Sequence, residues 1–317
     1  MKVAVIGAGA VGVGVCNYVI AMGSCSELVL LDMKKAKAEG ELMDFGHANS
    51  LTFSKNIKLK AGDDYAMVKD ADIVVVTAGA QVKEGQSRLD LAEINSQITV
   101  DIARQIETYA PNAILVLVTN PCDIATHFIV KNTGFEAHQV ISAGCIIDTA
   151  RLMKLVSERV EVDPKNVSGY ILGEHGSHCF MPWSLVGVAG QPIDYYCDQN
   201  GYDRMDPSEL LDAVRQAGFE IFNRKQNTTH GIAASVYRLI QAITIDEHSI
   251  LPVGTLLQGE YGLQDVVISL PTIINRQGAH KVLEHPFSEY ETQQLQEVVA
   301  TMKSLVADVA EKTGLKA

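Results

Sequence analysis

The chain has 317 residues, of which 47% are hydrophobic and 20% are charged. This composition is close to that of soluble globular proteins, so it excludes a disordered chain and a membrane protein. The net charge of −12 argues against a nucleic-acid partner, because phosphate binding depends on clustered lysine and arginine. An anionic substrate would therefore need cations placed locally in its site.

No segment resembles an export signal or a membrane span. The first twenty residues lack a basic lead-in and a small-residue cleavage site. No run reaches the roughly 18 apolar residues that a span needs. The six cysteines show no CxxC spacing and several lie in apolar segments, which favours reduced, buried thiols. We therefore expect a cytoplasmic protein without membrane contact.

The first half of the chain alternates apolar strands with amphipathic helices. Strands are predicted at 2–7, 27–32, 71–79 and 113–121, and helices at 10–23 and 92–110. In the second helix, isoleucines recur every four residues and are expected along one face: Ile94, Ile98, Ile102 and Ile106. This alternation indicates a parallel sheet covered by helices on both faces.

The second half, from about residue 144, mixes long helices with strands that look antiparallel, such as the segment 266–278. A helix is predicted over 207–225, with Pro207 near its first turn. The last helix opens with Ser288 and Glu291 at capping-box spacing and runs to Gly314. We therefore predict two domains, 1–143 with the parallel sheet and 144–317 as an α+β unit with antiparallel strands.

A glycine-rich turn, GAGAVG, joins the first strand to the first helix and places Gly7, Gly9 and Gly12 in GxGxxG spacing. The second strand ends at Asp32, twenty residues past Gly12, which is the context expected of a dinucleotide site. Gly7 permits the tight turn, Gly9 lets a pyrophosphate approach the backbone, and Gly12 allows close helix packing. The helix N-terminus faces the phosphates with its N–H groups. The first domain is therefore predicted to be a Rossmann-type, doubly wound α/β fold.

Asp32 favours NAD over NADP as the cofactor. Its carboxylate accepts hydrogen bonds from ribose hydroxyls, and its charge repels a 2′-phosphate. Lys34 and Lys35 follow closely and would soften this repulsion.

Four further stretches follow in order: GQSRLDL (85–91), VTNPCD (118–123), GCIIDTARL (144–152) and ILGEHG (171–176). Together with the glycine turn, they make the chain resemble the lactate and malate dehydrogenase family from residue 2 to the last helix. The resemblance is greatest to the bacterial L-lactate and L-2-hydroxyisocaproate dehydrogenase branch. It implies an NAD-dependent L-2-hydroxy acid dehydrogenase that acts on a small 2-oxo or 2-hydroxy acid and assembles as a homodimer or homotetramer.

His175 and Asp148 are the predicted proton-transfer pair. Oxidising a hydroxy acid requires a base for the hydroxyl proton, and imidazole titrates near neutral pH. The resemblance implies that Asp148 binds the other ring nitrogen and stabilises the imidazolium. His178, three residues on, raises the alternative of a metal pair. Gly176 argues against the helix that such a pair prefers, so no metal is expected.

Arg151 lies three residues after Asp148, so both side chains can point into one cavity if the segment is helical. Its guanidinium offers two parallel N–H groups to a carboxylate, and the alternative is a surface salt bridge. The resemblance adds Asn120 for the reacting oxygen beside the nicotinamide, with a cis bond to Pro121, and Thr228 beside the substrate side chain.

Arg88 and Val82 belong to a loop that is expected to close over the substrate. Arg88 would polarise the carbonyl once water has left, and the alternative is an exposed arginine without a role. Gly79, assigned to the cofactor site, and Gly85 would let this loop move.

In the family, the residue six before the arginine faces the substrate's variable group. Val82 occupies that position here and disfavours oxaloacetate, because a second carboxylate would be buried unpaired. A shift of one residue would place Gln81 there instead, so pyruvate and larger aliphatic 2-oxo acids both stay open.

Three positions depart from the family's pattern. Met153 and Ser168 stand where relatives activated by fructose 1,6-bisphosphate carry arginine and histidine, so we predict no activation by this anion. Ser177 replaces the usual aspartate after GEHG, which leaves open how the histidine loop is braced. Two rival hypotheses are a malate dehydrogenase and a catalytically silent NAD-binding protein.

Overall fold

A computed structural model describes residues 1–51, 56–81 and 88–317. Its first half contains six parallel strands in the order β3-β2-β1-β4-β5-β6. Their bounds are β1 (Lys2–Ile6), β2 (Glu27–Leu31), β3 (Lys58–Gly62), β4 (Ile73–Val76), β5 (Ile114–Leu117) and β6 (Val140–Ser142). This order is that of a doubly wound dinucleotide-binding sheet, so the predicted fold class is confirmed.

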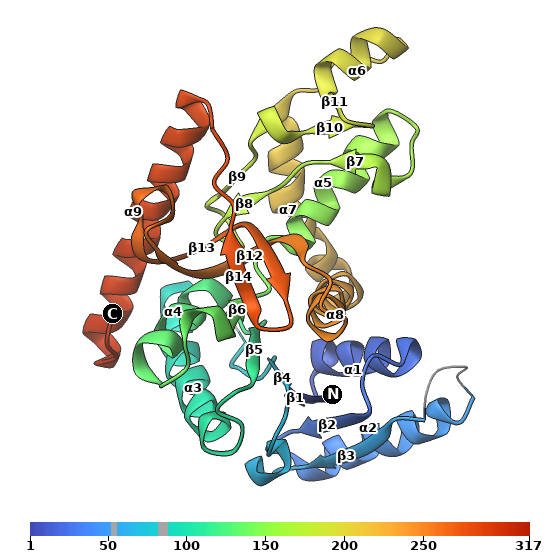
Figure 1. Ribbon diagram of the computed structural model, residues 1–317, viewed down its shortest axis with the longest axis vertical. Helices are drawn as coiled ribbons and strands as arrows, with labels where there is room; N and C mark the ends of the chain where they lie inside the picture. The colour runs from blue at the N-terminus through green and yellow to red at the C-terminus, as the bar shows by residue number, and fades with distance from the viewer. Residues whose placement is uncertain (52–55, 82–87) are drawn as a thin grey trace.

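Two apolar layers cover the sheet because side chains alternate along each strand. From β1, Ala4 and Ile6 join the layer under α3, α4 and α9, whereas Val3 and Val5 join the layer under α1 and α8. Figure 1 shows these helices on either side of the strands. The helices of the first half are α1 (Ala10–Met22), α2 (Lys35–Asn49), α3 (Arg88–Tyr109) and α4 (Cys122–Asn132).

The sheet continues into the second half through antiparallel strands, as the sequence predicts. β12 (Ser249–Gln258) pairs with β6 through Gly254 and Ser142, and β13 (Gln264–Asn275) then pairs with β12. β14 (Gly278–Val282) and β8 (Leu172–Gly173) flank β13, and β9 (Cys179–Phe180) pairs with β8. A small separate sheet has the order β11 (Gln191–Pro192), β10 (Gly187–Val188) and β7 (Val167–Ser168).

The helices of the second half are α5 (Ile146–Arg159), α6 (Ile193–Asn200), α7 (Pro207–Lys225), α8 (His230–Thr244) and α9 (Glu289–Thr313). Short 3₁₀ turns are η1 (Tyr65–Val68), η2 (Ala137–Gln139), η3 (Pro164–Asn166), η4 (Trp183–Leu185) and η5 (Glu260–Gly262). The predicted caps of α9 are confirmed: Ser288 and Glu291 form a capping box, and Gly314 ends the helix in the left-handed region. α9 then runs back along the first half and packs on α3 and α4 (Figure 1).

One expectation about α3 is wrong. Its isoleucines do not share one face, because Ile106 is fully buried whereas Ile94 is 36% exposed. Residues four apart on a helix of 3.6 residues per turn rotate by about 40° at each step, so the row drifts out of the core.

All six cysteines are buried and free, in agreement with the prediction of reduced thiols. Among the described residues, no helix combines the length and the apolar character that crossing a bilayer requires.

Candidate active site

The glycine turn before α1 has the geometry that a bound pyrophosphate needs. Gly7 has a φ of 109°, and a Cβ on Gly12 would lie 2.0 Å from the carbonyl oxygen of Gly7. Gly9 is the N-cap of α1, and a Cβ built on it would meet no atom of the described residues within 4 Å. The turn is therefore tight, the helix is closely packed, and the side at Gly9 is open to a ligand.

Asp32 lies beside this turn at the end of β2. Its Oδ2 accepts a hydrogen bond from the backbone N–H of Ala8 at 2.7 Å, and its Oδ1 accepts one from that of Lys34 at 2.8 Å. The Nζ of Lys35 lies 3.9 Å from an oxygen of Glu39. Lys35, one of the two lysines that could offset the charge of Asp32, thus already lies near another carboxylate. The negative charge of Asp32 therefore suits NAD, which has no 2′-phosphate.

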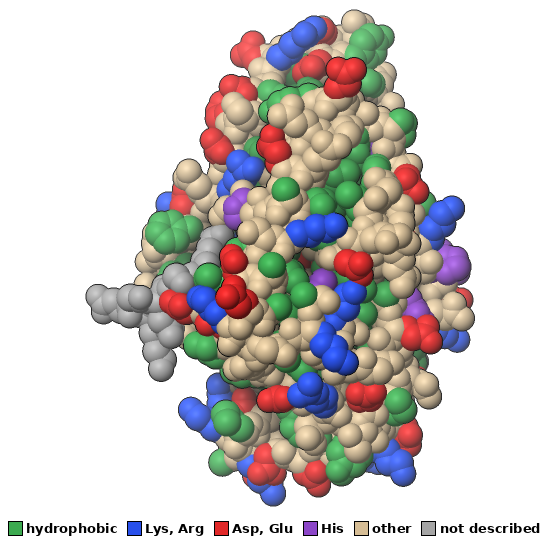
Figure 2. Space-filling model, turned by 90° about the vertical axis from the view of Figure 1, so that its left-hand side faces the viewer, with side chains coloured by type: hydrophobic (Ala, Val, Ile, Leu, Met, Phe, Trp, Pro, Cys, Tyr) green, Lys and Arg blue, Asp and Glu red, His purple; other side chains and the backbone are tan. Residues whose placement is uncertain are grey.

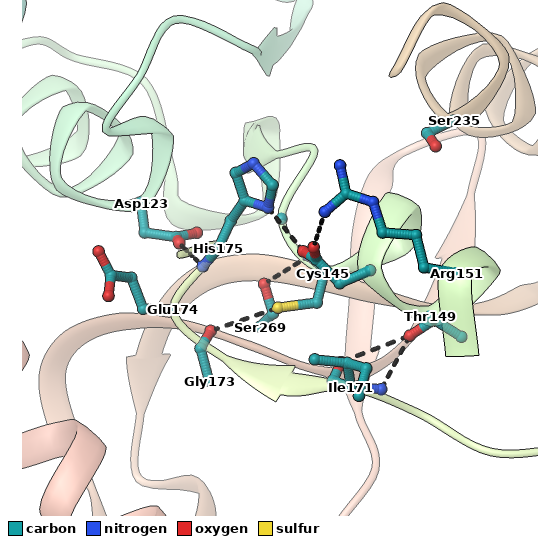
Figure 3. A network of polar contacts seen from close by, with 12 residues as sticks. Asp123, Cys145, Thr149, Arg151, Ile171, Gly173, Glu174, His175, Ser235 and Ser269 are labelled. Carbon is teal, nitrogen blue, oxygen red and sulfur yellow. Dashed lines mark hydrogen bonds and ion pairs between the residues drawn. The ribbon is translucent and has the colours of Figure 1, made fainter. Parts of the chain in front are cut away.

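Asp148 and Arg151 come from the first turns of α5, and His175 comes from the loop between β8 and β9. Nδ1 of His175 lies 2.6 Å from Oδ2 of Asp148, and an N–H of Arg151 donates to Oδ1 of the same carboxylate at 2.7 Å. The side chain of Asp148 is only 6% exposed. In Figure 3, dashed lines join both the His175 ring and the Arg151 guanidinium to this carboxylate.

The pKa values within this cluster are shifted in opposite directions. Burial alone would raise the pKa of Asp148, but the charges of His175 and Arg151 outweigh it and lower this pKa. Burial alone would lower the pKa of His175, but Asp148 outweighs it and raises this pKa. The cluster therefore favours an imidazolium beside an ionised carboxylate.

A cavity of about 260 Å³ brings the polar residues together, with Asn120, Arg151, His175 and Thr228 in its wall. Val11, from the glycine turn, lines the same cavity. The glycine turn and these polar residues therefore border one cavity. The peptide bond from Asn120 to Pro121 is cis, as the family resemblance implies.

Family models for lactate/malate dehydrogenases match both halves of the chain. The NAD binding domain matches residues 1–142, and the alpha/beta C-terminal domain matches residues 146–313. The chain belongs to the lactate/malate dehydrogenase family. Its first half is therefore the family's NAD-binding domain.

Relatives of known name agree with this placement. The chain is 41% identical to "L-lactate dehydrogenase 2" of Clostridium acetobutylicum and 40% identical to "L-lactate dehydrogenase" of Acetivibrio thermocellus, over 96% of both chains in each case. The solved minor L-lactate dehydrogenase of Enterococcus mundtii, in a ligand-bound form, superimposes with a TM-score of 0.92 at 34% identity. That match covers 96% of this chain and 97% of the other.

Asp123, in the NAD-binding half of the chain, binds the backbone of the loop that carries His175. It lies in the first turn of α4, is 1% exposed, and its Oδ2 accepts a hydrogen bond from the backbone N–H of His175 at 2.8 Å. Burial raises its pKa to about 6. A Cβ on Gly254 would lie 2.5 Å from the other carboxylate oxygen, so glycine in β12 leaves room for this aspartate.

Glu174 and His178 bond to each other within the same loop. Between them lies Ser177, at the position where the family usually has an aspartate. The buried Oε2 of Glu174 accepts from the backbone N–H of His178 at 3.1 Å and lies 2.5 Å from its Nδ1. The carboxylate next to the loop histidine thus closes the turn from 174 to 178.

Thr149 and Ser269 fix α5 relative to this loop. Oγ1 of Thr149 accepts from the backbone N–H of Ile171 at 2.9 Å, and Oγ of Ser269 accepts from that of Cys145 at 3.2 Å (Figure 3). The helix that carries Asp148 is therefore held against the segment that leads to His175.

The structure shows a packing reason for glycine at position 79, in addition to the loop freedom that we expected. A Cβ at this position would lie 2.3 Å from the methyl carbon of Thr119, so glycine is required by close packing. Asn95 clamps the next residue, accepting from the N–H of Ala80 at 2.7 Å and donating to the carbonyl of Asn120 at 2.7 Å. Glycine at this position thus has a packing reason, and the expected contribution of Gly79 to loop motion and to the cofactor site stays a prediction.

Part of the predicted loop, residues 82–87, lies outside the described residues. Val82 and Gly85 lie outside the described residues, as does the side chain of Arg88. Gln81 is described and exposed.

Sequence reasoning missed Asn95, Asp123, Thr149, Glu174 and Ser269. The acidic Asp123 within the apolar segment "CDIATHFIV" was the one available signal, because an unpaired carboxylate is costly to bury.

Proposed function

We propose that the protein is an NAD-dependent L-2-hydroxy acid dehydrogenase of the L-lactate dehydrogenase type. It would interconvert pyruvate, or a larger aliphatic 2-oxo acid, and the corresponding 2-hydroxy acid. One observation carries the proposal: His175 and Arg151 share the buried carboxylate of Asp148 at the wall of a cavity that Asn120 also lines. The names of the two relatives at 41% and 40% identity support it.

Arg151 is proposed to bind the carboxylate of the substrate. One N–H of its guanidinium is fixed by Asp148, so the remaining donors are held in a set direction toward the cavity. A Cβ on Gly218 would lie 3.2 Å from this guanidinium, so glycine at that position leaves space for it. A planar guanidinium held in this way sets the orientation of a carboxylate as well as its affinity.

His175 is proposed to transfer the proton. Because Nδ1 faces Asp148, Nε2 is the atom available to the reacting oxygen. In reduction, the imidazolium gives its Nε2 proton to that oxygen, and in oxidation the neutral ring removes it. Bound NADH supplies the hydride that C2 of the 2-oxo acid receives. Asn120 would donate a hydrogen bond to the same oxygen, and Asp148 stabilises the charged ring.

Three further roles rest on the family resemblance. Arg88 is proposed to polarise the carbonyl, and Thr228 to flank the substrate side chain. Val82, or Gln81 after a shift of one residue, is proposed to face the variable group. An aliphatic side chain there would make oxaloacetate a poor substrate.

Steady-state assays of NADH oxidation with pyruvate, 2-oxoisocaproate and oxaloacetate test this function. We expect turnover of the first two, and a fall in kcat of roughly 10²- to 10⁴-fold in His175→Asn. His248→Asn is a matched control, because that exposed histidine also lies near a carboxylate, 3.8 Å from Asp246, and is not among the described residues that line the cavity of His175. A clear preference for oxaloacetate would establish the malate alternative, and no turnover would establish a silent NAD-binding protein.

We also propose that residues 1–143 and 144–317 are the two domains, that the protein is cytoplasmic, and that it forms a homodimer or homotetramer. The free thiols support the compartment. Exposed apolar side chains just after α2 and on α7, such as Leu51 at 83% and Phe219 at 68%, support association. On the face in Figure 2, basic side chains are interspersed with acidic ones.

A further inference from the structure

A further cation borders the cavity of His175, at the C-terminal end of α7. Lys225 lines this cavity together with Ile221, which lies one helical turn earlier. α7 packs on α5, the helix that carries Arg151 (Figure 1). The proton transfer proposed for His175 and the carboxylate binding proposed for Arg151 do not involve this lysine.

The position of Lys225 on α7 directs its side chain toward the cavity. Residues 214, 218, 221 and 225 follow one another at steps of four, three and four, so they lie along one face of the helix. At the inner end of this face Val214 is buried, and a Cβ on Gly218 would lie 3.2 Å from the guanidinium of Arg151. Ile221 and Lys225 continue the same face and line the cavity.

Lys225 stands at the outer end of this face and not beside the reacting groups. It comes seven positions after Gly218, which corresponds to roughly 10 Å along the helix axis. Lys225 is exposed, whereas the side chain of Arg151 is only 18% exposed. The ammonium group therefore acts on an approaching substrate mainly through its charge, at the outer end of the cavity.

The balance of charge around the cavity makes this lysine matter to an anion. Among the described residues that line the cavity there is no aspartate and no glutamate. Arg151 is bonded to the carboxylate of Asp148 at 2.7 Å, so the charges of these two groups largely cancel. Imidazoles aside, Lys225 is then the one uncompensated positive charge in the described lining.

The neighbouring cation, Arg224, has a different environment. Its guanidinium lies 3.5 Å from a carboxylate oxygen of Glu220, whereas among the described residues no carboxylate forms an ion pair with Lys225. Adjacent residues of a helix point about 100° apart, and Arg224 is not among the described residues of the cavity lining. The two cations thus differ in the direction of the side chain and in pairing, but not in their place along the chain.

We propose that Lys225 is an electrostatic steering residue, whose charge draws anionic 2-oxo acids to the outer end of the cavity and so toward Arg151. The chain as a whole carries a net charge of −12, so an anion is repelled by most of the molecule. A cation at the entrance of a cleft raises the local concentration of an anionic substrate. The inference rests on the proposed function, since it takes Arg151 to bind the carboxylate of the substrate.

The test measures kcat/KM for pyruvate at saturating NADH and at several salt concentrations. At an ionic strength of about 0.01 M, Lys225→Gln should lower kcat/KM by roughly 2- to 5-fold. Lys225→Glu changes the charge by twice as much and should lower it by roughly 4- to 25-fold. Both losses should shrink at about 1 M salt, where charges are screened. Lys225→Arg should keep most of the wild-type value, and kcat should change little in all three.

Arg224→Gln is the matched control, because it removes the same charge one residue away. It should lower kcat/KM less than Lys225→Gln does. Both cations also lie in the last turn of α7, where positive charge stabilises a helix. Denaturant unfolding of both variants measures that effect separately. A Lys225→Gln protein that lost stability while its salt dependence matched the wild type would show a structural role and overturn the inference.

The remaining outcomes also decide the question. Equal salt-dependent losses in Lys225→Gln and Arg224→Gln would assign the effect to overall charge and overturn the inference. A raised KM for NADH with an unchanged KM for pyruvate would assign the lysine to the cofactor, with the same consequence. Turnover of pyruvate that does not respond to Lys225→Glu overturns the steering role alone. A wild-type protein that reduces no 2-oxo acid overturns the proposed function as well.

Discussion

His175 and His178 lie three residues apart in one loop, and each bonds to a carboxylate. The hydrogen-bond geometry of the two histidine–carboxylate pairs is nearly the same. Nδ1 of His175 is 2.6 Å from Asp148, and Nδ1 of His178 is 2.5 Å from Glu174. Both carboxylates are buried. Geometry within the pair therefore does not by itself decide which of the two rings would transfer a proton.

The surroundings of the two pairs differ. Asp148 accepts a second, charged donor from Arg151, whereas Glu174 accepts the backbone N–H of its own histidine partner. The side chain of His175 is 20% exposed and that of His178 is 44% exposed. Greater burial of the ring and the neighbouring cation support the proposal that His175, and not His178, transfers the proton.

The largest expected effect comes from removing the charge of Asp148. Asp148→Asn should lower kcat for pyruvate reduction by roughly 10²- to 10⁴-fold, whereas Glu174→Gln should cause a much smaller loss. Reduction needs protonated His175, whose pKa Asp148 raises above its ordinary value of 6.5. Activity should therefore fall as pH rises through that raised pKa, and this fall should move to lower pH in Asp148→Asn.

Profiles of kcat against pH for the wild type and both variants would show the shift. Equal losses and equal shifts in Asp148→Asn and Glu174→Gln would mean that the two pairs are equivalent.

Replacing Arg151 tests the cation that only one pair possesses. Arg151→Lys keeps the charge but loses the planar set of donors, so KM for pyruvate should rise roughly 10- to 100-fold. Arg159→Lys, on the same helix and paired at the surface with Glu209, is the matched control. An Arg151→Lys enzyme with the KM of the control would place Arg151 outside the substrate site.

His127 shows what becomes of a buried histidine that lacks a carboxylate partner. Neither of its ring nitrogens has a hydrogen-bond partner among the described residues, and burial lowers its pKa to about 4. Below pH 6.5 the unfolded chain binds a proton that the folded chain does not. Its contribution to stability is therefore full above pH 6.5 and is lost as pH falls toward 4.

Denaturant unfolding of the wild type and His127→Phe at pH 7.5 and 5 measures this contribution. The free energy of unfolding of the wild type, relative to the variant, should fall by about 2 kcal/mol between these pH values. The comparison must be relative, because Asp123, with its pKa raised to about 6, contributes in the opposite sense. A pH-independent difference would show that His127 does not titrate in this way.

The smallest expected effect concerns Asp32, which resembles Glu174 because backbone N–H groups bind its carboxylate. Such a carboxylate is expected to act on specificity and not on proton transfer. Asp32→Ser should raise the ratio of kcat/KM for NADPH over NADH by about 10-fold, since one repulsive charge is removed. Unchanged cofactor preference, with the pH profile altered instead, would contradict this distinction.

The first half of the fold was predictable because its signals are local. Strand and helix periods, the spacing from Gly7 to Gly12, and Asp32 after β2 all fall within short segments of sequence. The cluster of His175, Asp148 and Arg151 was reachable through the family resemblance, which supplies a spacing that local patterns do not.

The supporting contacts were not predictable because they join distant positions through tertiary packing. Asp123 binds the backbone of a residue 52 positions away, and such a bond leaves no trace in the partner's side chain. The close packing at Gly79 was not foreseen for a similar reason, since a glycine needed for close packing and one needed for motion look the same in a sequence. His178 raised the idea of a metal pair, whereas in the structure its ring turns to Glu174.

The aspartate at 123 and the glycine at 254 belong to different halves of the gene, yet one occupies space that the other vacates. A chimera made from two distant relatives would keep the bond from Asp123 to the backbone of His175 only if aspartate at 123 and glycine at 254 were both present. A hybrid that gained a side chain at 254 while retaining the acid would force the two apart. The two halves of the chain are thus coupled at this contact, because each contributes one side of it.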